Sequence, residues 1–522
     1  MQANNNNNIK RAELPESRVL IVGTGGTISM VKTDRGLVPS SGLFQTALKP
    51  RPSFNDLSPP ESIDIVDSDG KTVQLESLRT PRSQYGRPVR YTVLEFQKLL
   101  DSSSIDAKGW TEIALTIQRN YELFDAFVIL HGTDSLAYTC SALSFMLQNL
   151  GKPVILTGSQ ASMLELQNDA TDNLLGSLII AGHFMIPEVC LFFNYKLFRG
   201  NRTTKVSAEE FSAFASPNFP PLATITSLKT RVSWDLIHRA TQIKPFRVQA
   251  NLDTIHVACL RIFPGIRVAM VEAVLNVDGL RGLVLETFGA GNAPGGPDGL
   301  LTKVLADAVR KGIVIVNVTQ CMTGSVNPLY ESARYLDQVG VISGYDLTSE
   351  AALTKLSYLI ALPGMTTADV RRLMASNLRG EITLTAQTQF IGDQLAPGKA
   401  VLSRLGYAIA EGEMHRVLDI LERFEDRPEW LLNEADYTGN TPLHLAATGP
   451  NLEILLTLLS KGASVHIRNR EGKTPLFLAA QAGLRGHVIL LRKSGAHLHP
   501  TEIAIARLHA QENSSIWQEA GL

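Results

Sequence analysis

The sequence predicts two α/β domains of unequal size followed by an all-α stack of helical repeats. Short β-branched runs alternate with helical patterns from residue 19 onward, a shorter series follows a helix-poor stretch, and a nine-residue motif recurs near the C-terminus. The length of 522 residues also exceeds one core, since a domain has roughly 150 residues. At 44% hydrophobic and 19% charged residues, the chain is typical of globular proteins, which excludes collagen-like, coiled-coil and mostly disordered classes.

The low net charge bears on which partners the protein binds, and the small number of cysteines bears on the cellular compartment. A formal net charge of −1 gives no general attraction to nucleic acid or anionic membranes, so a small or neutral ligand is favoured. The four cysteines form no CxxC pair, and no histidine cluster has zinc spacing, which argues against a disulfide framework and a structural metal site. We therefore expect a cytoplasmic protein with no metal, no cofactor and no nucleic-acid partner.

Two stretches are excluded as targeting or membrane segments. Residues 1–17 are polar, include five consecutive asparagines and contain no apolar run, so we expect a disordered tail and no secretion signal. The apolar window 173–193 is interrupted by a histidine, a proline and a glutamate, which favours a buried helix followed by a strand over a membrane span.

We place the larger domain at residues 18–225. Its apolar, β-branched runs alternate with helical patterns, which indicates a parallel sheet covered by helices. The predicted strands are 19–22, 127–130, 153–157 and 189–193. The segment 38–90 is rich in proline, serine and charge and is longer than a normal βα connection, so we expect an extended excursion near a site or partial disorder.

A smaller α/β domain is placed at residues 250–385, after the helix-poor stretch 217–249. Its predicted strands are 282–285, 313–318 and 340–343.

The C-terminal region, residues 400–511, contains a repeated motif. Gly-Asn-Thr-Pro-Leu-His-Leu-Ala-Ala at 439–447 recurs as Gly-Lys-Thr-Pro-Leu-Phe-Leu-Ala-Ala at 472–480, a period of 33 residues. This period and the Thr-Pro helix start resemble the ankyrin repeat. A degenerate copy near residue 408 makes about three units, close to the minimum for a stable stack, and 501–517 is the expected closing cap. An unrelated helical tail is the alternative.

Four polar segments are candidates for a site. They are Gly-Thr-Gly-Gly-Thr-Ile at 23–28, Asp-Ser-Ser-Ser at 101–104, His-Gly-Thr-Asp at 131–134 and Arg-Gly-Asn-Arg-Thr-Thr-Lys at 199–205. The first is not a Walker loop, because no Lys-Ser/Thr follows, and it lacks the third glycine of the dinucleotide fingerprint. Since ligands of open α/β sheets bind at the carboxyl ends of strands, we expect the four segments to converge.

Hydroxyl, carboxylate and lysine together suggest nucleophilic catalysis. A threonine hydroxyl, Thr24 or Thr27 in the first segment, is a weak nucleophile and needs a base, which a buried, uncharged lysine supplies. Asp134 would orient that lysine or hold a substrate ammonium. The alternative is a set of ordinary turn residues.

The same segments, together with Thr-Gly-Ser-Gln at 157–160, resemble the type I L-asparaginases over about residues 19–380. With the repeats included, the chain is similar to ankyrin-bearing animal asparaginases, which are also described as lysophospholipases. The resemblance implies a flavodoxin-like larger domain and a smaller α/β domain. It also implies that Thr27 is a nucleophile forming a β-aspartyl ester, with Thr133, Asp134 and Lys205 as the set that polarises the threonine hydroxyl.

The resemblance implies the remaining site residues as well. Asp101, Ser102 and Ser103 match the loop that binds the α-amino and α-carboxylate groups of the substrate, with help from Thr133 and Asp134. Backbone N–H groups are the expected oxyanion donors.

Two further site residues, Tyr330 and Asn292, are expected on less direct grounds. The first stands in for a family tyrosine, and the second would act in a neighbouring subunit. Many members carry a tyrosine where this chain has Leu37, and Tyr330 is the expected substitute; the alternative is that Tyr330 packs at a domain edge. Asn292 matches a segment that approaches a neighbouring subunit, so we expect a homodimer or homotetramer, although an ordinary glycine turn is equally compatible.

An allosteric asparagine site known in the bacterial enzymes is expected to be absent or altered. Thr204 and Cys321 match positions that line it, but the arginine expected nearby is Glu286, and the carboxylate-binding fork is therefore lost. We expect Cys321 to be a small buried residue.

The resemblance thus implies hydrolysis of L-asparagine to L-aspartate and ammonia, with water as the second substrate. The first alternative is lysophospholipase, transacylase or platelet-activating-factor acetylhydrolase activity, which the absence of a Gly-x-Ser-x-Gly elbow disfavours. The second alternative is an inactive asparaginase part carrying an ankyrin scaffold that binds a protein partner.

Overall fold

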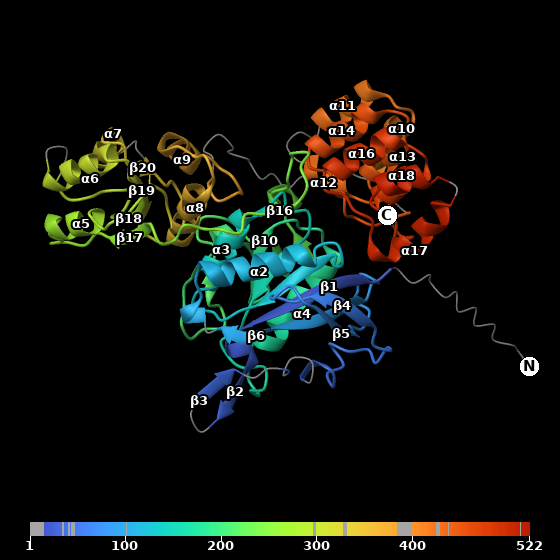
Figure 1. The fold of residues 1–522 in the computed structure, drawn as a ribbon, viewed down its shortest axis with the longest axis horizontal. Helices are drawn as coiled ribbons and strands as arrows, with labels where there is room; N and C mark the ends of the chain where they lie inside the picture. Colours follow the sequence, from blue (N-terminus) through green and yellow to red (C-terminus); the bar gives the residue numbers. More distant parts are fainter. Residues whose placement is uncertain are drawn as a thin grey trace, which may run out of the picture.

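The structure is a computed structural model that describes residues 15–33, 36–39, 42, 47–100, 102–295, 299–326, 331–383, 399–423, 428–436, 438–511 and 513–522. Two α/β sheets and a helical stack make up these ranges (Figure 1). Most of the expected N-terminal tail, residues 1–14, lies outside the described residues. Among the described residues, no helix is long and apolar enough to cross a membrane.

The larger domain is built on a sheet that has ten strands in the described part of the chain, in the order β15-β14-β11-β10-β9-β7-β1-β6-β5-β4. Its central strands are parallel: β6 (Val89–Leu100), β1 (Ser17–Gly25), β7 (Ala126–Leu130), β9 (Val154–Thr157) and β10 (Val189–Phe193). The predicted strands 19–22, 127–130, 153–157 and 189–193 correspond to β1, β7, β9 and β10, whereas β6 was not predicted. β7, β9 and β10 are almost wholly apolar because helices cover both faces, and β6 also carries polar and charged residues.

The covering helices follow from the alternation of side chains along each strand. Leu20 and Val22 of β1 share one core with helices α2 (Ala107–Arg119) and α3 (Leu136–Met146). Val19 and Ile21 point the other way and share a second core with α4 (Ala170–His183).

The outer strands of this sheet are antiparallel, so the sheet is mixed. On one side lie β11 (Lys196–Arg199), β14 (Ala223–Ile225) and β15 (Thr230–Val232). On the other side, the hairpin of β4 (Ser62–Val66) and β5 (Thr72–Arg79) joins β6.

This hairpin corrects the expectation for 38–90. The described part of that segment holds two sheet strands, because Ile63, Ile65, Val73 and Leu75 alternate with polar residues and pack against the core. The many prolines flank these strands and hide the alternation.

The smaller domain has four parallel strands among the residues described: β17 (Val257–Arg261), β18 (Gly282–Thr287), β19 (Val314–Thr319) and β20 (Ile342–Ser343). Helices α5 (Val268–Leu275), α6 (Leu300–Arg310) and α7 (Glu331–Gln338) share one core with this sheet. Helices α8 (Ser349–Ala361) and α9 (Thr367–Met374) share the other, which is continuous with the core of the larger domain. A hydroxyl pair, Ser141 Oγ and Thr354 Oγ1 at 2.7 Å, joins α3 to α8.

The C-terminal stack consists of helix pairs. They are α10 (Lys399–Ala410) with α11 (Met414–Arg423), α13 (Pro442–Thr448) with α14 (Leu452–Ser460), α15 (Pro475–Gln481) with α16 (Arg485–Lys493), and α17 (Pro500–His509) with α18 (Ser514–Glu519). A short helix, α12 (Pro428–Asn433), lies between the first two pairs. The last pair closes the core with Trp517, as expected of the cap.

The Thr-Pro motif begins the second and third helix pairs for a local reason. Proline at the first helical position has no N–H to leave unsatisfied, and the preceding threonine caps the helix. Thr474 Oγ1 accepts from the Phe477 N–H at 3.2 Å and donates to Glu502 Oε2 at 3.1 Å.

We expect Thr474→Ala to lower the free energy of unfolding of the stack by about 1–2 kcal/mol, because the cap and the buried contact to Glu502 are both lost. The matched control is Thr448→Ala, whose exposed hydroxyl lies at the end of α13. Its effect should stay within about 0.5 kcal/mol. Urea unfolding measures both, and equal losses would contradict the assigned capping role.

Candidate active site

The predicted polar segments meet at the carboxyl edge of the main sheet. Strands β6, β1, β7 and β9 are neighbours and run in the same direction, so the residues that follow them lie at one edge. Thr27 follows β1, Thr133 and Asp134 follow β7, Gln160 follows β9 and Ser102 follows β6.

Two glycines let the turns approach one another. Gly26 has a φ of 90°, and a Cβ placed on it would lie 2.4 Å from the backbone of Gly132. A Cβ on Gly132 would in turn lie 2.4 Å from Ser102 Oγ. The turns after β1 and β7 are therefore packed against each other through backbone atoms, and the Ser102 side chain after β6 packs on the backbone of Gly132, which only glycine permits.

The first segment presents one hydroxyl and uses the other in the fold. Thr24 is buried, and its Oγ1 donates to the Leu130 carbonyl at 2.9 Å, so it joins β1 to β7. Thr27 opens a single 3-10 turn, Thr27–Ser29, and is half-buried. Of the two candidates, Thr27 is the hydroxyl available to a substrate.

The strongest polar contact at this edge joins Lys205 to Thr133 and Asp134. Lys205 Nζ lies 3.0 Å from Thr133 Oγ1 and 2.9 Å from Asp134 Oδ1. Thr133 Oγ1 donates in turn to Gln160 Oε1 at 3.2 Å. The hydroxyl of Thr133 is thus held between a donor and an acceptor, an orientation suited to proton transfer.

Gln160 was not predicted as a site residue, and Asp169 holds its backbone. The Asp169 carboxylate accepts from the N–H groups of Gln160 and Ala161 at 3.0 Å and 3.1 Å. Burial raises the pKa of Asp169, against the effect of these hydrogen bonds. The position of Gln160 directly after a predicted parallel strand was the signal that could have found it.

Most of the polar residues in segment 199–205 hold the fold together. Within this segment, Lys205 is the residue that contacts Thr133 and Asp134. Arg202 makes a two-point contact with Asp346 at 3.0 Å and 2.7 Å, and Arg199 pairs with Glu188 at 2.6 Å. Since Asp346 belongs to the smaller domain, the contact of Arg202 ties the two α/β domains together next to the site.

His131 is also structural. It is 1% exposed, its Nδ1 lies 2.7 Å from the Gly132 carbonyl, and its Nε2 lies 3.0 Å from Thr139 Oγ1. Burial lowers its pKa to about 4, so the ring is neutral at pH 7. Its role is to fix the turn that carries Thr133.

The other predicted site residues are placed as follows. Ser102 is buried and its carbonyl accepts from Ser135 Oγ, while Ser103 is exposed. Asn292 lies in the smaller domain after β18, where its backbone pairs with Phe288 at 2.8 Å and 2.9 Å. Asp101 and Tyr330 lie outside the described residues.

The region matched to an allosteric site is rich in carboxylates. Thr204 Oγ1 donates to Glu350 Oε1 at 2.7 Å, and Glu286 pairs with Arg261 at 3.0 Å. Burial raises the pKa of Glu350. Cys321 is exposed, so the expectation that it is buried was wrong. Cys321 lies just after the end of β19, where the chain reaches solvent. The expectation rested only on the usual burial of cysteine side chains.

Comparisons with known proteins agree with this architecture. Residues 18–238 match the family model "Asparaginase, N-terminal", residues 256–374 match "Glutaminase/Asparaginase C-terminal domain", and residues 405–502 match "Ankyrin repeats (3 copies)". The chain is 40% identical to the mouse protein named 60 kDa lysophospholipase, over 87% of this chain and 80% of that one. It is 35% identical to an L-asparaginase from Dirofilaria immitis, over 92% of this chain and 82% of that one.

Bacterial relatives match the two α/β domains. L-asparaginase 1 of Escherichia coli K12 is 40% identical over 71% of this chain and 99% of its own length. The crystal structure of L-asparaginase I from Vibrio cholerae superposes with a TM-score of 0.59 at 36% identity, covering 71% of this chain and all of that one.

We expect Gly26→Ala to lower the free energy of unfolding by roughly 3 kcal/mol, because a methyl group there both strains the backbone and overlaps Gly132. The control is Gly312→Ala, which has a φ of 95° and nothing within 4 Å of the added carbon. It should lose only the backbone component, about 1–2 kcal/mol. Denaturant unfolding of both variants is the measurement, and equal losses would contradict the close approach.

Proposed function

The chain belongs to the asparaginase family, and we propose that it hydrolyses L-asparagine to L-aspartate and ammonia through an acyl-enzyme on Thr27. The observation that carries this proposal is the contact of Lys205 with both Thr133 and Asp134, at the sheet edge where the turn bearing Thr27 packs on Gly132. The names of the bacterial and nematode relatives support the same activity.

The proposed reaction has two steps. Thr27 Oγ attacks the side-chain amide carbon of asparagine, its proton passes to the set of Thr133 and Lys205, and the amide nitrogen takes up a proton and leaves as ammonia. Water then attacks the β-aspartyl ester, gives a proton back to Thr27 Oγ and releases aspartate. Backbone N–H groups of the glycine turns are suited to hold the oxyanion of each tetrahedral intermediate.

Local charges would hold the zwitterionic substrate. The side chain of Asp134 is 66% exposed, so its carboxylate has room to pair with a substrate ammonium as well as with Lys205. Ser102 and Ser103 follow β6 on the other side of the β1 turn, a place suited to binding the α-carboxylate. A net protein charge of −1 fits a substrate with no net charge.

We propose that the active form is a homodimer or homotetramer in the cytoplasm. Asn292 lies on the smaller domain, and the family resemblance assigns it to a segment that approaches a neighbouring subunit, which supports this proposal. Each of the four cysteines, all within the described ranges, is free, which fits a reducing compartment.

Lipid ester hydrolysis is the second candidate, favoured by the name of the mouse relative. The sequence has no Gly-x-Ser-x-Gly elbow to supply a serine nucleophile. Release of fatty acid from lysophosphatidylcholine by the Thr27→Ala variant tests whether such an activity has a separate site.

We expect Thr27→Ala and Thr133→Ala each to lower kcat for ammonia release from asparagine by about 10³-fold or more, because one removes the nucleophile and the other the proton path. Thr24→Val is the control, since its hydroxyl is used only in the fold. It should lower stability by about 1 kcal/mol and leave kcat within a few-fold. Unchanged rates in both active-site variants would refute the assignment, and an inactive parent protein would favour the scaffold alternative.

A further inference from the structure

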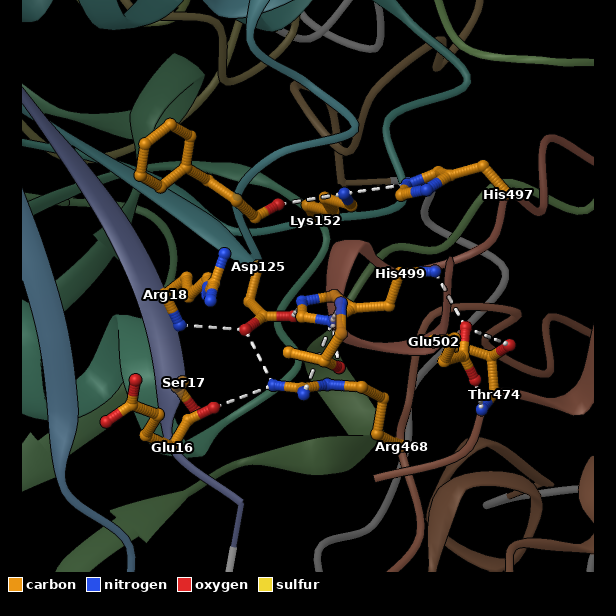
Figure 2. A network of polar contacts seen from close by, with 12 residues as sticks. Glu16, Ser17, Arg18, Asp125, Lys152, Arg468, Thr474, His497, His499 and Glu502 are labelled. Carbon is orange, nitrogen blue, oxygen red and sulfur yellow. Dashed lines mark hydrogen bonds and ion pairs between the residues drawn. The ribbon is translucent and has the colours of Figure 1, made fainter. Parts of the chain in front are cut away.

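The loop ends of the last two repeats lie against the larger domain. We call residues 466–470 and 496–499 the docking loops. Figure 2 shows Arg468 of the first loop reaching Asp125 of the larger domain, with Nη2 of the arginine 2.8 Å from Oδ2 of the aspartate. Asp125 directly precedes β7, so this contact is made at the amino edge of the main sheet, opposite to the edge that carries Thr133.

Asp125 gathers groups from three parts of the chain. Its Oδ2 accepts from the Arg18 N–H of β1 at 2.8 Å as well as from Arg468, and Nε2 of His499 lies 3.4 Å from Oδ1. The side chains of Asp125, Arg468 and His499 are 14%, 3% and 4% exposed. Burial alone would raise the pKa of Asp125, but Arg468 and His499 hold it well below its usual value.

Lys152 makes the second polar contact between the two units. Its Nζ lies 2.5 Å from the Tyr121 carbonyl, 2.8 Å from the Phe124 carbonyl and 2.8 Å from Nε2 of His497. Nδ1 of His497 lies 3.0 Å from the Leu498 carbonyl, which assigns the ring proton to Nδ1 and leaves Nε2 as an acceptor. The docked repeat thus supplies a third polar partner for this buried amino group, whose pKa is lowered by burial to about 7.

Aromatic rings surround this contact. The ring of Tyr121 stacks on Phe246 at 3.9 Å between centroids. The rings of His466 and His497 approach the same tyrosine edge-on at 5.9 Å and 6.3 Å. These rings bury apolar surface around the charged pairs, so the contact has both a hydrophobic part and a polar part that fixes its register.

We propose that the docking loops form a permanent intramolecular interface whose partner is the amino edge of the larger domain of the same chain. The repeats then act as a stabilising part of the α/β unit, and a protein partner of the stack must bind elsewhere on it. This follows from the desolvation of the contact. A face offered to other proteins would not bury Arg468 against a carboxylate of its own chain.

The test uses the full chain and does not depend on activity. Arg468→Met should lower the unfolding midpoint by more than about 5 °C, because it leaves Asp125 without its cation. It should also raise the exchange rate of the docking-loop amides by at least about tenfold and increase the radius of gyration in solution scattering. The matched control is Arg485→Met, which removes an exposed ion pair with Glu519 within the stack. This control should change none of the three.

A second variant keeps the test independent of Asp125, whose replacement risks the fold of β1 and β7. His497→Phe keeps a ring but removes the acceptor of Lys152, and it should show the same three changes. The interface is refuted if Arg468→Met and His497→Phe behave like Arg485→Met. It is also refuted if crosslinks between a docking loop and the Asp125 turn occur only between chains, because the partner would then be a second copy.

Docking should weaken in acid. The rings of His466, His497 and His499 are buried, and burial lowers the pKa of each below 6.5. The charged and titratable groups that face them are Lys152, Asp125, Arg468, Glu122, Arg87, Tyr121 and Glu502.

The sign follows from proton binding. Detached histidines have a pKa near 6.5 and bind protons that the docked rings exclude, so docking is strongest above about pH 6.5 and weakens below it. Asp125, whose pKa is lowered, acts in the same direction at lower pH. We expect the radius of gyration to rise between pH 7.5 and 5. The Arg485→Met variant should show the same rise as the parent chain. A radius of gyration that stays constant from pH 7.5 to 5 would contradict the proposal that neutral, buried histidines hold the interface.

Discussion

The contact between the backbones of Gly26 and Gly132 is the constraint on which the rest of the site depends. Parallel strands place the turns after β1 and β7 at the same edge, but turns with side chains at these positions would be held apart. With two glycines, the turn that bears Thr27 packs on the turn that bears Thr133. A contact of Lys205 with the Thr133 turn is then enough to place its amino group next to both turns.

The residues around this contact divide into those proposed to face a substrate and those whose polar atoms are bound within the fold. Thr24 and His131 sit within the same polar runs as Thr27 and Thr133, yet their polar atoms are spent on carbonyl and hydroxyl partners inside the protein. The arginine-rich run before Lys205 likewise binds carboxylates, and one of these pairs, Arg202 with Asp346, joins the two α/β domains. Most residues of these polar motifs therefore hold the turns in place, and only a few of them are left to contact a ligand.

The sequence was sufficient for the fold class, the asparaginase resemblance and the ankyrin repeats, because each rests on short-range patterns: apolar runs, glycine turns and a fixed period. The hairpin of β4 and β5 was missed because prolines flank two short strands whose pattern is completed only by pairing with β6. Gln160 was missed because it enters the site through pairing of distant strands. The contact of Arg468 with Asp125 joins positions 343 apart, and no local pattern encodes such a pair.

The two edges of one parallel sheet have separate uses in this molecule. β7 is five residues long, so Asp125 and the turn of Thr133 are separated by roughly 17 Å of rigid, fully buried strand. A module that docks at the amino edge is thus kept a full strand length away from the turn of Thr133.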